Sequence, residues 1–135
     1  MNYFITAIDS NVGKTIVSAI LCKALNYSYW KPIQCGDLEN SDTLKVKEFV
    51  NEVNTYKEEF ALKFPLSPHE SARLSGIEVK LNDFRLPKQG SLIVEGAGGR
   101  VLKRKGLSEY SCDVAADNTM FDLTNIGSSS TVKRK

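Results

Sequence analysis

The chain has 135 residues, of which 41% are hydrophobic, enough for the core of one domain, and its net charge of +2 argues against nucleic-acid and membrane partners. Its three cysteines show no CxxC spacing, which argues against a disulfide framework and a zinc site. Because the N-terminus lacks the basic region of a signal peptide and no apolar stretch reaches membrane-spanning length, the sequence predicts a cytoplasmic protein.

The first predicted unit is a strand, a loop and a helix. An apolar run at residues 3–8 predicts the strand, and apolar residues at helical spacing predict a helix over 14–25. Between them, Val12-Gly13-Lys14-Thr15 matches the end of a phosphate-binding loop. Five residues separate Gly13 from the small residue Ala7, whereas four separate the two glycines of a standard loop, so this loop is an atypical one.

This loop predicts phosphate chemistry. Lys14 would neutralise the β- and γ-phosphates of a nucleotide, the Thr15 hydroxyl would bind Mg²⁺, and the positive end of the helix dipole would favour the anion. A Gly-Lys-Thr triplet can also occur by chance at the start of a helix. The strand before the triplet and the helix after it favour the functional interpretation.

The next elements follow in chain order. Residues 27–33 (YSYWKPI) predict an aromatic-rich strand with Pro32 near its end, because proline cannot donate a ladder hydrogen bond. Ser41 is a suitable N-cap for an amphipathic helix over 42–53. Ser67-Pro68, with a glutamate two positions later, predicts the start of a short helix that Gly76 ends.

Residues 91–95 (SLIVE) have the continuous apolar character of a buried parallel strand, and a glycine-rich turn follows. The alternation of strands and helices predicts an α/β protein: a three-layer P-loop or Rossmann-like fold with a mainly parallel sheet. The pattern changes after residue 99. Residues 100–105 contain four basic side chains and no periodicity continues to residue 135, so 100–135 is predicted to be a loosely ordered basic tail and the fold to be incomplete at the C-terminus.

Ligands of open α/β sheets bind at the carboxyl ends of the strands, and Lys31, Gly13 and Glu95 all fall there. Together with Thr15, the carboxylates of Asp42 and Glu95 could hold Mg²⁺, which uses few protein oxygens beside phosphate and water. Lys31 could instead be a solvated lysine and Asp42 a first-turn charge of a helix. Glu95, however, ends an apolar strand, where a carboxylate needs a partner.

Two other side chains are weaker candidates. Cys35 lies in the loop after Lys31, so it could line the site, but nothing marks it as a nucleophile. His69 is the only histidine, and packing at a helix start is favoured over a catalytic role.

Together these motifs resemble the dethiobiotin synthetases, ATP-dependent enzymes that act before the last step of biotin synthesis. The resemblance covers residues 1–99 and is carried, in order, by IDSNVGKT, YWKPIQCGD, NSD, PLSPHESA and LIVEGAGG. The five-residue gap before Gly-Lys-Thr is itself typical of this family. The family commonly has glycine and threonine where this chain has Ala7 and Ser10. From residue 100 onward the chain departs from the family pattern.

The resemblance implies a ligase that closes the cyclic urea of dethiobiotin on 7,8-diaminopelargonate, with carbon dioxide and ATP as co-substrates, Mg²⁺ as cofactor and a homodimer as the working form. Residues 1–99 would then be the N-terminal part of a P-loop ATP-binding domain. Lys31 and Lys14 would act in catalysis, Lys31 by stabilising the carbamate and the transferred phosphoryl group, and Cys35 would contact the substrate. The implied metal ligands are Thr15, Asp42 and Glu95. The residues implied to lie along the nucleotide are Asn11, Val12, Gly13, Lys14, Thr15, Ile16, Asp42, Glu95, Gly96, Ala97 and Gly98.

Two alternatives stay open. Since the later elements of the family have no counterpart after residue 99, the chain could be a truncated or sequence-altered synthetase, for example one read out of frame beyond Gly99, or an inactive nucleotide-binding remnant of that enzyme. The partitioning and division-site ATPases share this type of loop, but they carry a signature lysine near its start. Residues 7–10 contain no lysine, so this second class ranks low.

Overall fold

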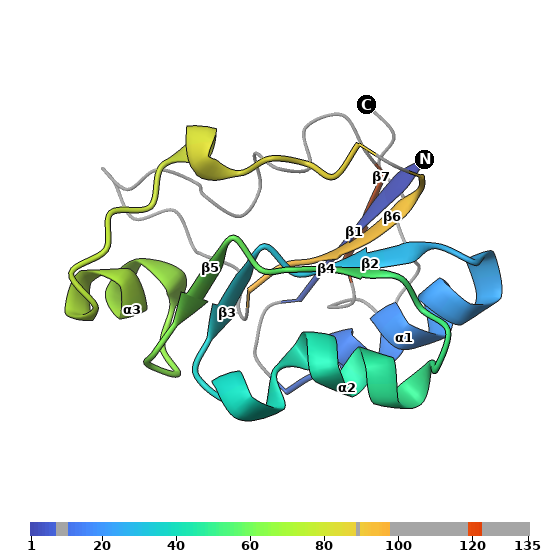
Figure 1. Cartoon of the computed structure of the whole chain (residues 1–135), viewed down its shortest axis with the longest axis horizontal. Coiled ribbons are helices and arrows are strands. Elements are labelled where there is room, and N and C mark those ends of the chain that lie inside the picture. Colours follow the sequence, from blue (N-terminus) through green and yellow to red (C-terminus); the bar gives the residue numbers. More distant parts are fainter. Residues whose placement is uncertain (8–10, 89, 98–118, 123–135) are drawn as a thin grey trace.

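The computed structural model describes residues 1–7, 11–88, 90–97 and 119–122 (Figure 1). Its centre is a parallel five-stranded sheet in the order β4-β2-β6-β1-β7. The five strands are β1 (Asn2–Thr6), β2 (Ser28–Trp30), β4 (Thr55–Tyr56), β6 (Leu92–Glu95) and β7 (Thr119–Asp122). A separate parallel pair joins β3 (Ile33–Cys35) to β5 (Phe60–Leu62). The predicted α/β class with a mainly parallel sheet is confirmed.

Strand β6 lies at the centre of the sheet because it is apolar on both faces. Each of its residues, from Leu92 to Glu95, is buried, as expected for a strand covered on both sides. It pairs with β1 on one side and with β2 on the other. The register sets Ile5 beside Glu95 and Trp30 beside Val94, so the residue after Trp30, Lys31, comes next to Glu95.

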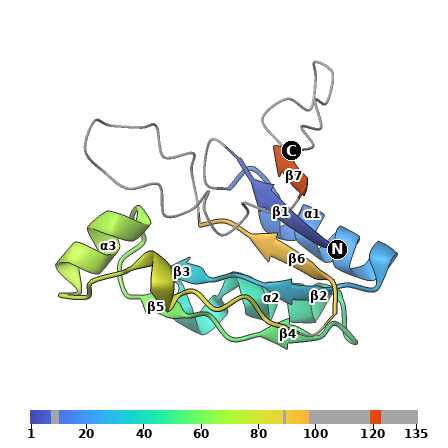
Figure 2. The ribbon, with the colours of Figure 1, turned by 90° about the horizontal axis from the view of Figure 1, so that it is seen from above.

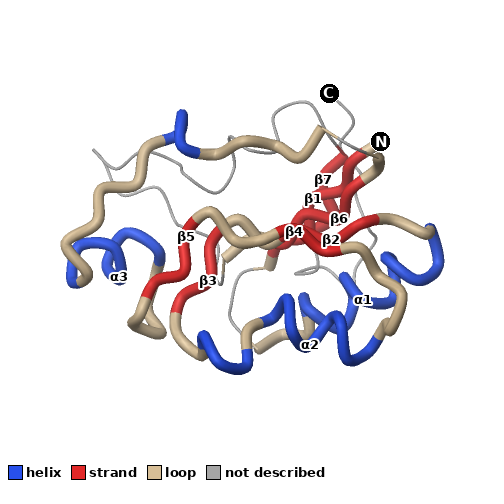
Figure 3. The backbone as a smooth tube through the Cα atoms, viewed as in Figure 1, coloured by secondary structure: helices blue, strands red, loops and turns tan. Residues whose placement is uncertain are grey.

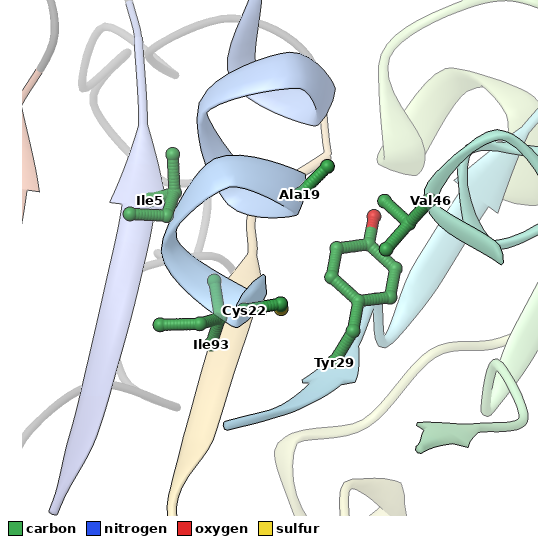
Figure 4. Close-up of a cluster of buried hydrophobic side chains, with 6 residues drawn as sticks. All are labelled: Ile5, Ala19, Cys22, Tyr29, Val46 and Ile93. Atoms are coloured by element: carbon green, nitrogen blue, oxygen red, sulfur yellow. The ribbon is translucent and has the colours of Figure 1, made fainter. Parts of the chain in front are cut away.

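Two helices cover one face of this sheet, α1 (Lys14–Leu25) and α2 (Asp42–Phe49) (Figures 1 and 2). The core on this face joins both helices to three strands (Figure 4). Its buried members are Ile5, Ala19, Cys22, Tyr29, Val46 and Ile93. Because side chains alternate along a strand, the neighbours Phe4, Trp30, Leu92 and Val94 form a second buried cluster on the opposite face.

The predicted single strand over 27–33 is wrong in one respect, because the chain divides at Lys31-Pro32 into β2 and β3. Proline cannot donate to a sheet ladder, and here the Pro32 carbonyl accepts a bond of 3.0 Å from the backbone N–H of Phe60. β3 therefore leaves the main sheet and pairs with β5. This break ends β2 just before Lys31.

The two predicted helix starts are confirmed in position, with differences at their ends. The hydroxyl of Ser41 accepts a bond of 3.4 Å from the Leu44 N–H and caps α2. This helix ends at Phe49 rather than at residue 53, but Val50 and Val53 still pack on the core, which explains why the apolar spacing continues. Helix α3 (Pro68–Leu74) follows Ser67, whose side chain makes no capping bond. Among the described residues, no helix is both long and apolar enough to cross a membrane.

A smaller layer is formed by α3 and the β3–β5 pair, at the end of the molecule away from β1 (Figures 1 and 3). Its buried centre is Ile33, Leu62 and Ala72. Short 3₁₀ turns occur at Leu38–Asn40 and Leu81–Asp83. This layer places the loop after β3 beside the carboxyl ends of β2 and β6.

One described segment falls within residues 100–135. The strand β7 pairs in parallel with β1, with Phe4 opposite Met120 in the register. The rest of the predicted basic tail lies outside the described residues. The boundary at residue 99 therefore stays a prediction, although four residues beyond it belong to the same sheet as β1.

Gly36 is a position where replacement by alanine should destabilise the fold. Its φ of +69° favours glycine, and an added Cβ would lie 2.6 Å from the Pro65 Cβ and 2.8 Å from the Pro65 Cα. Backbone strain and overpacking together should lower the free energy of unfolding by about 2–4 kcal/mol. Gly76→Ala is the matched control, because Gly76 has a φ of +65° and open space around its Cβ position. Equal losses for the two variants in urea unfolding would contradict the packing argument.

Candidate active site

A cavity of about 670 Å³ opens at the carboxyl ends of β2 and β6, beside the start of α1. Ten of the residues that the sequence indicated line it, and they come from four separate parts of the chain. They are Asn11, Gly13, Lys14, Thr15, Ile16, Lys31, Cys35, Asp42, Glu95 and Ala97. The structure therefore brings together most of the predicted site, while the role of each residue stays a prediction.

The loop before α1 has the backbone that a phosphate cradle needs. Asn11 and Gly13 both have positive φ, of 58° and 93°, and the helix begins directly afterwards at Lys14. There is no acidic residue in the first turn of α1, so no negative charge opposes the positive end of the helix dipole at this cavity. Lys14 is buried and lines the cavity. Residues 8–10 of the loop are outside the described part of the chain.

Lys31 is the centre of a buried ion cluster. Its Nζ donates to Glu95 Oε1 at 3.1 Å and to Asp42 Oδ2, and only 4% of the residue is exposed. Burial alone would lower the pKa of Lys31, but the carboxylates of Glu95 and Asp42 outweigh it and raise the pKa. Lys31 is therefore a permanent positive charge at the base of the cavity.

Glu95 is held by three donors although it is only 1% exposed. Its Oε1 accepts from Lys31 and, at 3.0 Å, from the Thr15 hydroxyl, while its Oε2 accepts from the Tyr29 hydroxyl at 2.9 Å. The sequence predicted that this carboxylate needs a partner, and the structure supplies three. Hydrogen bonds of this kind offset the cost of burying a polar side chain.

Asp42 is the second carboxylate of the cluster and begins α2. Burial alone would raise the pKa of Asp42, but the ammonium groups of Lys31 and then Lys45 outweigh it and lower the pKa. Asp42 is therefore ionised at neutral pH and contributes a negative charge beside Lys31.

The three predicted metal ligands fit a small hard cation. The carboxylates of Asp42 and Glu95 both accept from the ammonium of Lys31, and the Thr15 hydroxyl donates to the same Oε1 of Glu95. Within the described ranges, no group of three or more histidine, cysteine or acidic side chains could hold a metal ion by itself. One hydroxyl and two carboxylates suit Mg²⁺, which takes one or two carboxylates and completes its shell with phosphate and water.

The remaining predicted residues lie differently. Val12 is exposed and does not line the cavity. Gly96 also lies off the cavity: its N–H donates to the Ile5 carbonyl at 2.9 Å, and a Cβ there would lie 2.9 Å from the Phe4 ring. Gly98 is outside the described residues. His69 is exposed on α3 and does not line the cavity.

Cys35 lines the cavity as a half-buried thiol. Burial raises its pKa to about 11, against the opposing charge of Lys31. The group is therefore neutral at physiological pH, which agrees with the absence of any sequence mark for a nucleophile.

Sequence reasoning missed three polar side chains at this site. Tyr29 reads as an ordinary core aromatic of a strand, and only the register of β2 against β6 reveals its contact with Glu95. Lys45 pairs with Asp42 at 3.4 Å and with Asp37 at 3.1 Å. The spacing of three residues between Asp42 and Lys45 on a helix could have indicated this pair. The amide of Gln34 accepts the backbone N–H of Asp42 at 3.4 Å, a contact with no sequence signal.

The chain is similar to known proteins over much of its length. A family model described as an AAA domain matches residues 1–117. A protein of Christiangramia forsetii named ATP-dependent dethiobiotin synthetase BioD is 48% identical over 101 residues, which are 73% of this chain and 49% of that protein. A protein of the same name from Cytophaga hutchinsonii is 42% identical over 125 residues, 89% of this chain and 58% of that protein. A third of this name, from Chlamydia pneumoniae, is 48% identical over 96 residues, 70% of this chain and 43% of that protein.

These matches confirm the resemblance that the motifs indicated. The chain spans about half the length of the curated relatives it matches. The family model and the longest of these three alignments both extend past Gly99. Because the family model covers most of the chain and the phosphate loop stands at the carboxyl edge of a parallel sheet, the chain belongs to the AAA-domain family of P-loop proteins.

Proposed function

We propose that this chain carries the catalytic nucleotide site of an ATP-dependent dethiobiotin synthetase. The observation that carries the proposal is the cluster in which Lys31 meets Asp42 and Glu95 beside the phosphate loop. A fixed positive charge next to two metal-ligating carboxylates suits a reaction in which negative charge moves between a phosphate and a second anion. The names of the relatives support the same reaction.

The proposed reaction joins 7,8-diaminopelargonate and carbon dioxide at the expense of ATP. One amine attacks the carbon of carbon dioxide and loses a proton, which gives a carbamate. A carbamate oxygen attacks the γ-phosphorus, the bond from that phosphorus to the bridging oxygen breaks, and ADP leaves. The second amine then attacks the carbamate carbon and loses a proton, the bond from that carbon to the phosphorylated oxygen breaks, and phosphate leaves as the cyclic urea closes.

The residues of the cavity would divide this work. The backbone from Asn11 to Ile16 would cradle the phosphates, with Lys14 neutralising their charge. Lys31 would stabilise the carbamate and the phosphoryl group in transfer, because its ammonium stays charged and lines the same cavity.

Mg²⁺ would be held by Thr15, Asp42 and Glu95 and, when bound, would draw negative charge from the phosphoryl oxygens. Asp42 and Glu95 both bond to Lys31, and the Thr15 hydroxyl bonds to Glu95, so the three side chains lie together at the cavity, which supports the assignment. The same proposal has Cys35 in contact with the substrate, and Glu95 and Ala97, which line the cavity, along the nucleotide. A homodimer and a cytoplasmic location belong to it as well and rest on the sequence alone.

The direct test is phosphate release from ATP by the purified chain, with and without diaminopelargonate and bicarbonate. We expect phosphate release that requires diaminopelargonate, bicarbonate and Mg²⁺. Phosphate release that does not depend on diaminopelargonate would count against the synthetase reaction. Complete absence of phosphate release, together with retained nucleotide binding, would favour the nucleotide-binding remnant instead. In that case the site binds but does not catalyse.

Lys14→Ala should weaken binding of ATP in the presence of Mg²⁺ by roughly 10- to 100-fold, because it removes a charged donor from the phosphates. The measurement is a calorimetric titration. Lys23→Ala is the matched control, since Lys23 is an exposed lysine in the last turn of the same helix. Equal affinities for the two variants would exclude the phosphate role of the loop.

A further inference from the structure

The carboxylate of Glu95 has two oxygens with different surroundings. Its Oε1 accepts from Thr15 and Lys31, both of which line the cavity, whereas its Oε2 accepts from the Tyr29 hydroxyl. Tyr29 is fully buried and does not line the cavity. Tyr29 therefore contacts Glu95 from the core, on the side of the carboxylate away from the cavity.

The strand register explains how the two side chains meet. Tyr29 on β2 pairs with Ile93 on β6, and Glu95 comes two residues later on the same face. A diagonal neighbour on the next strand lies within reach of a long aromatic side chain. The contact joins residues 66 positions apart in the sequence, so it forms only when β2 and β6 pair in this register.

The ring of Tyr29 is itself held in place. It lies between α1 and α2, with Ala19 and Cys22 on one side and Val46 on the other (Figure 4). Its backbone N–H donates to the Asn54 carbonyl at 2.8 Å. Burial and then the charge of Glu95 raise the pKa of Tyr29 well above its ordinary value, so the hydroxyl keeps its proton and stays a donor.

We propose that Tyr29 is a positioning residue for Glu95, which fixes Oε2 from the core so that Oε1 faces Thr15 and the cation site. The last torsion of a glutamate is broad, so a carboxylate without a second donor can rotate. Groups that hydrogen-bond a metal-ligating side chain from outside tune its affinity for the metal. This inference rests on the proposed function, in which Glu95 holds Mg²⁺.

The test is the Mg²⁺ concentration that gives half of the full nucleotide affinity, measured by calorimetry on the 135-residue chain with ATP as the probe. Tyr29→Phe keeps the ring and removes only the hydroxyl. We expect it to need about tenfold more Mg²⁺ and to bind ATP in excess EDTA as the wild type does. Tyr27→Phe, a hydroxyl removed two residues away in the same chain segment, should change neither value.

A purely structural role would give a different result. It would lower the melting temperature of Tyr29→Phe and leave the Mg²⁺ requirement unchanged, which would overturn the proposal. Failure of Tyr29→Phe to fold would make the hydroxyl a requirement of folding and would also count against it. In a Glu95→Gln background, Tyr29→Phe should no longer alter the Mg²⁺ requirement, because the group that it positions is gone.

The two levels of the proposal can fail separately. If the wild type binds ATP equally with and without Mg²⁺, the proposed metal site fails, and the role of Tyr29 fails with it. If the wild type depends on Mg²⁺ and the tyrosine variant depends on it to the same degree, only the role of Tyr29 is excluded.

Discussion

Replacement of Lys31 by methionine should lower the phosphate release that depends on diaminopelargonate and bicarbonate by about 10²–10³-fold, the usual effect of removing one donor that stabilises a transition state. The same change leaves Asp42 and Glu95 near each other without their shared cation. Since removal of one partner from a buried ion pair costs about 3–5 kcal/mol, the free energy of unfolding should fall as well. Urea unfolding and phosphate release are measured on the same preparation.

The control for this variant is Lys47→Met, which removes an exposed lysine from α2. Its activity and unfolding should match those of the wild type. A folded Lys31→Met protein with full activity would show that the ammonium at the base of the cavity takes no part in the reaction. A binding titration with ATP separates the loss of chemistry from a loss of nucleotide affinity.

The second large effect is expected from Glu95→Gln. This change keeps the shape of the side chain but removes one of the two charges that would hold Mg²⁺, and it leaves Lys31 with Asp42 alone. Metal stabilisation of a transferring phosphoryl group is worth several kcal/mol, so phosphate release should drop at least about 100-fold at ordinary Mg²⁺ concentrations. Part of the loss should return at high Mg²⁺.

Glu48→Gln serves as the neutral comparison, because Glu48 is exposed on α2. The informative measurement is phosphate release across a Mg²⁺ titration. If Glu95→Gln lowers the maximal rate of phosphate release but leaves the Mg²⁺ midpoint as in the wild type, Glu95 supports the fold and does not bind the metal.

The local patterns of the sequence predicted the first unit of the fold well. A strand, a loop with Gly13 and a helix from Lys14 are all present, because their signals are short-range: apolar spacing, a glycine that can adopt positive φ and a helix start. The carboxyl-end rule for parallel sheets also predicted that Lys31 and Glu95 would share one edge. The first prediction depends only on residues close together in the sequence, and the second only on the parallel arrangement of the strands.

What the sequence did not predict depends on long-range geometry. The run from Tyr27 to Ile33 reads as one strand, and the departure of β3 at Pro32 follows from its pairing with β5, which no local pattern encodes. The bond from Tyr29 to Glu95 depends on the register between two strands, and an aromatic residue in a strand gives no sign of such a bond. β7 is four residues long, too short for a pattern to stand out within a basic segment.

The wall of the cavity has a balance of charge that bears on the order in which ligands enter. Its described lining has three lysines and three acidic residues, so their formal charges cancel. They are Lys14, Lys31, Lys45, Asp37, Asp42 and Glu95. A bare divalent cation or a bare polyphosphate would each leave an excess of one sign in a partly desolvated space, where uncompensated charge is costly. A metal ion that enters with the nucleotide offsets part of the negative charge of the polyphosphate, so this wall favours nucleotide that arrives with its metal over nucleotide that arrives bare.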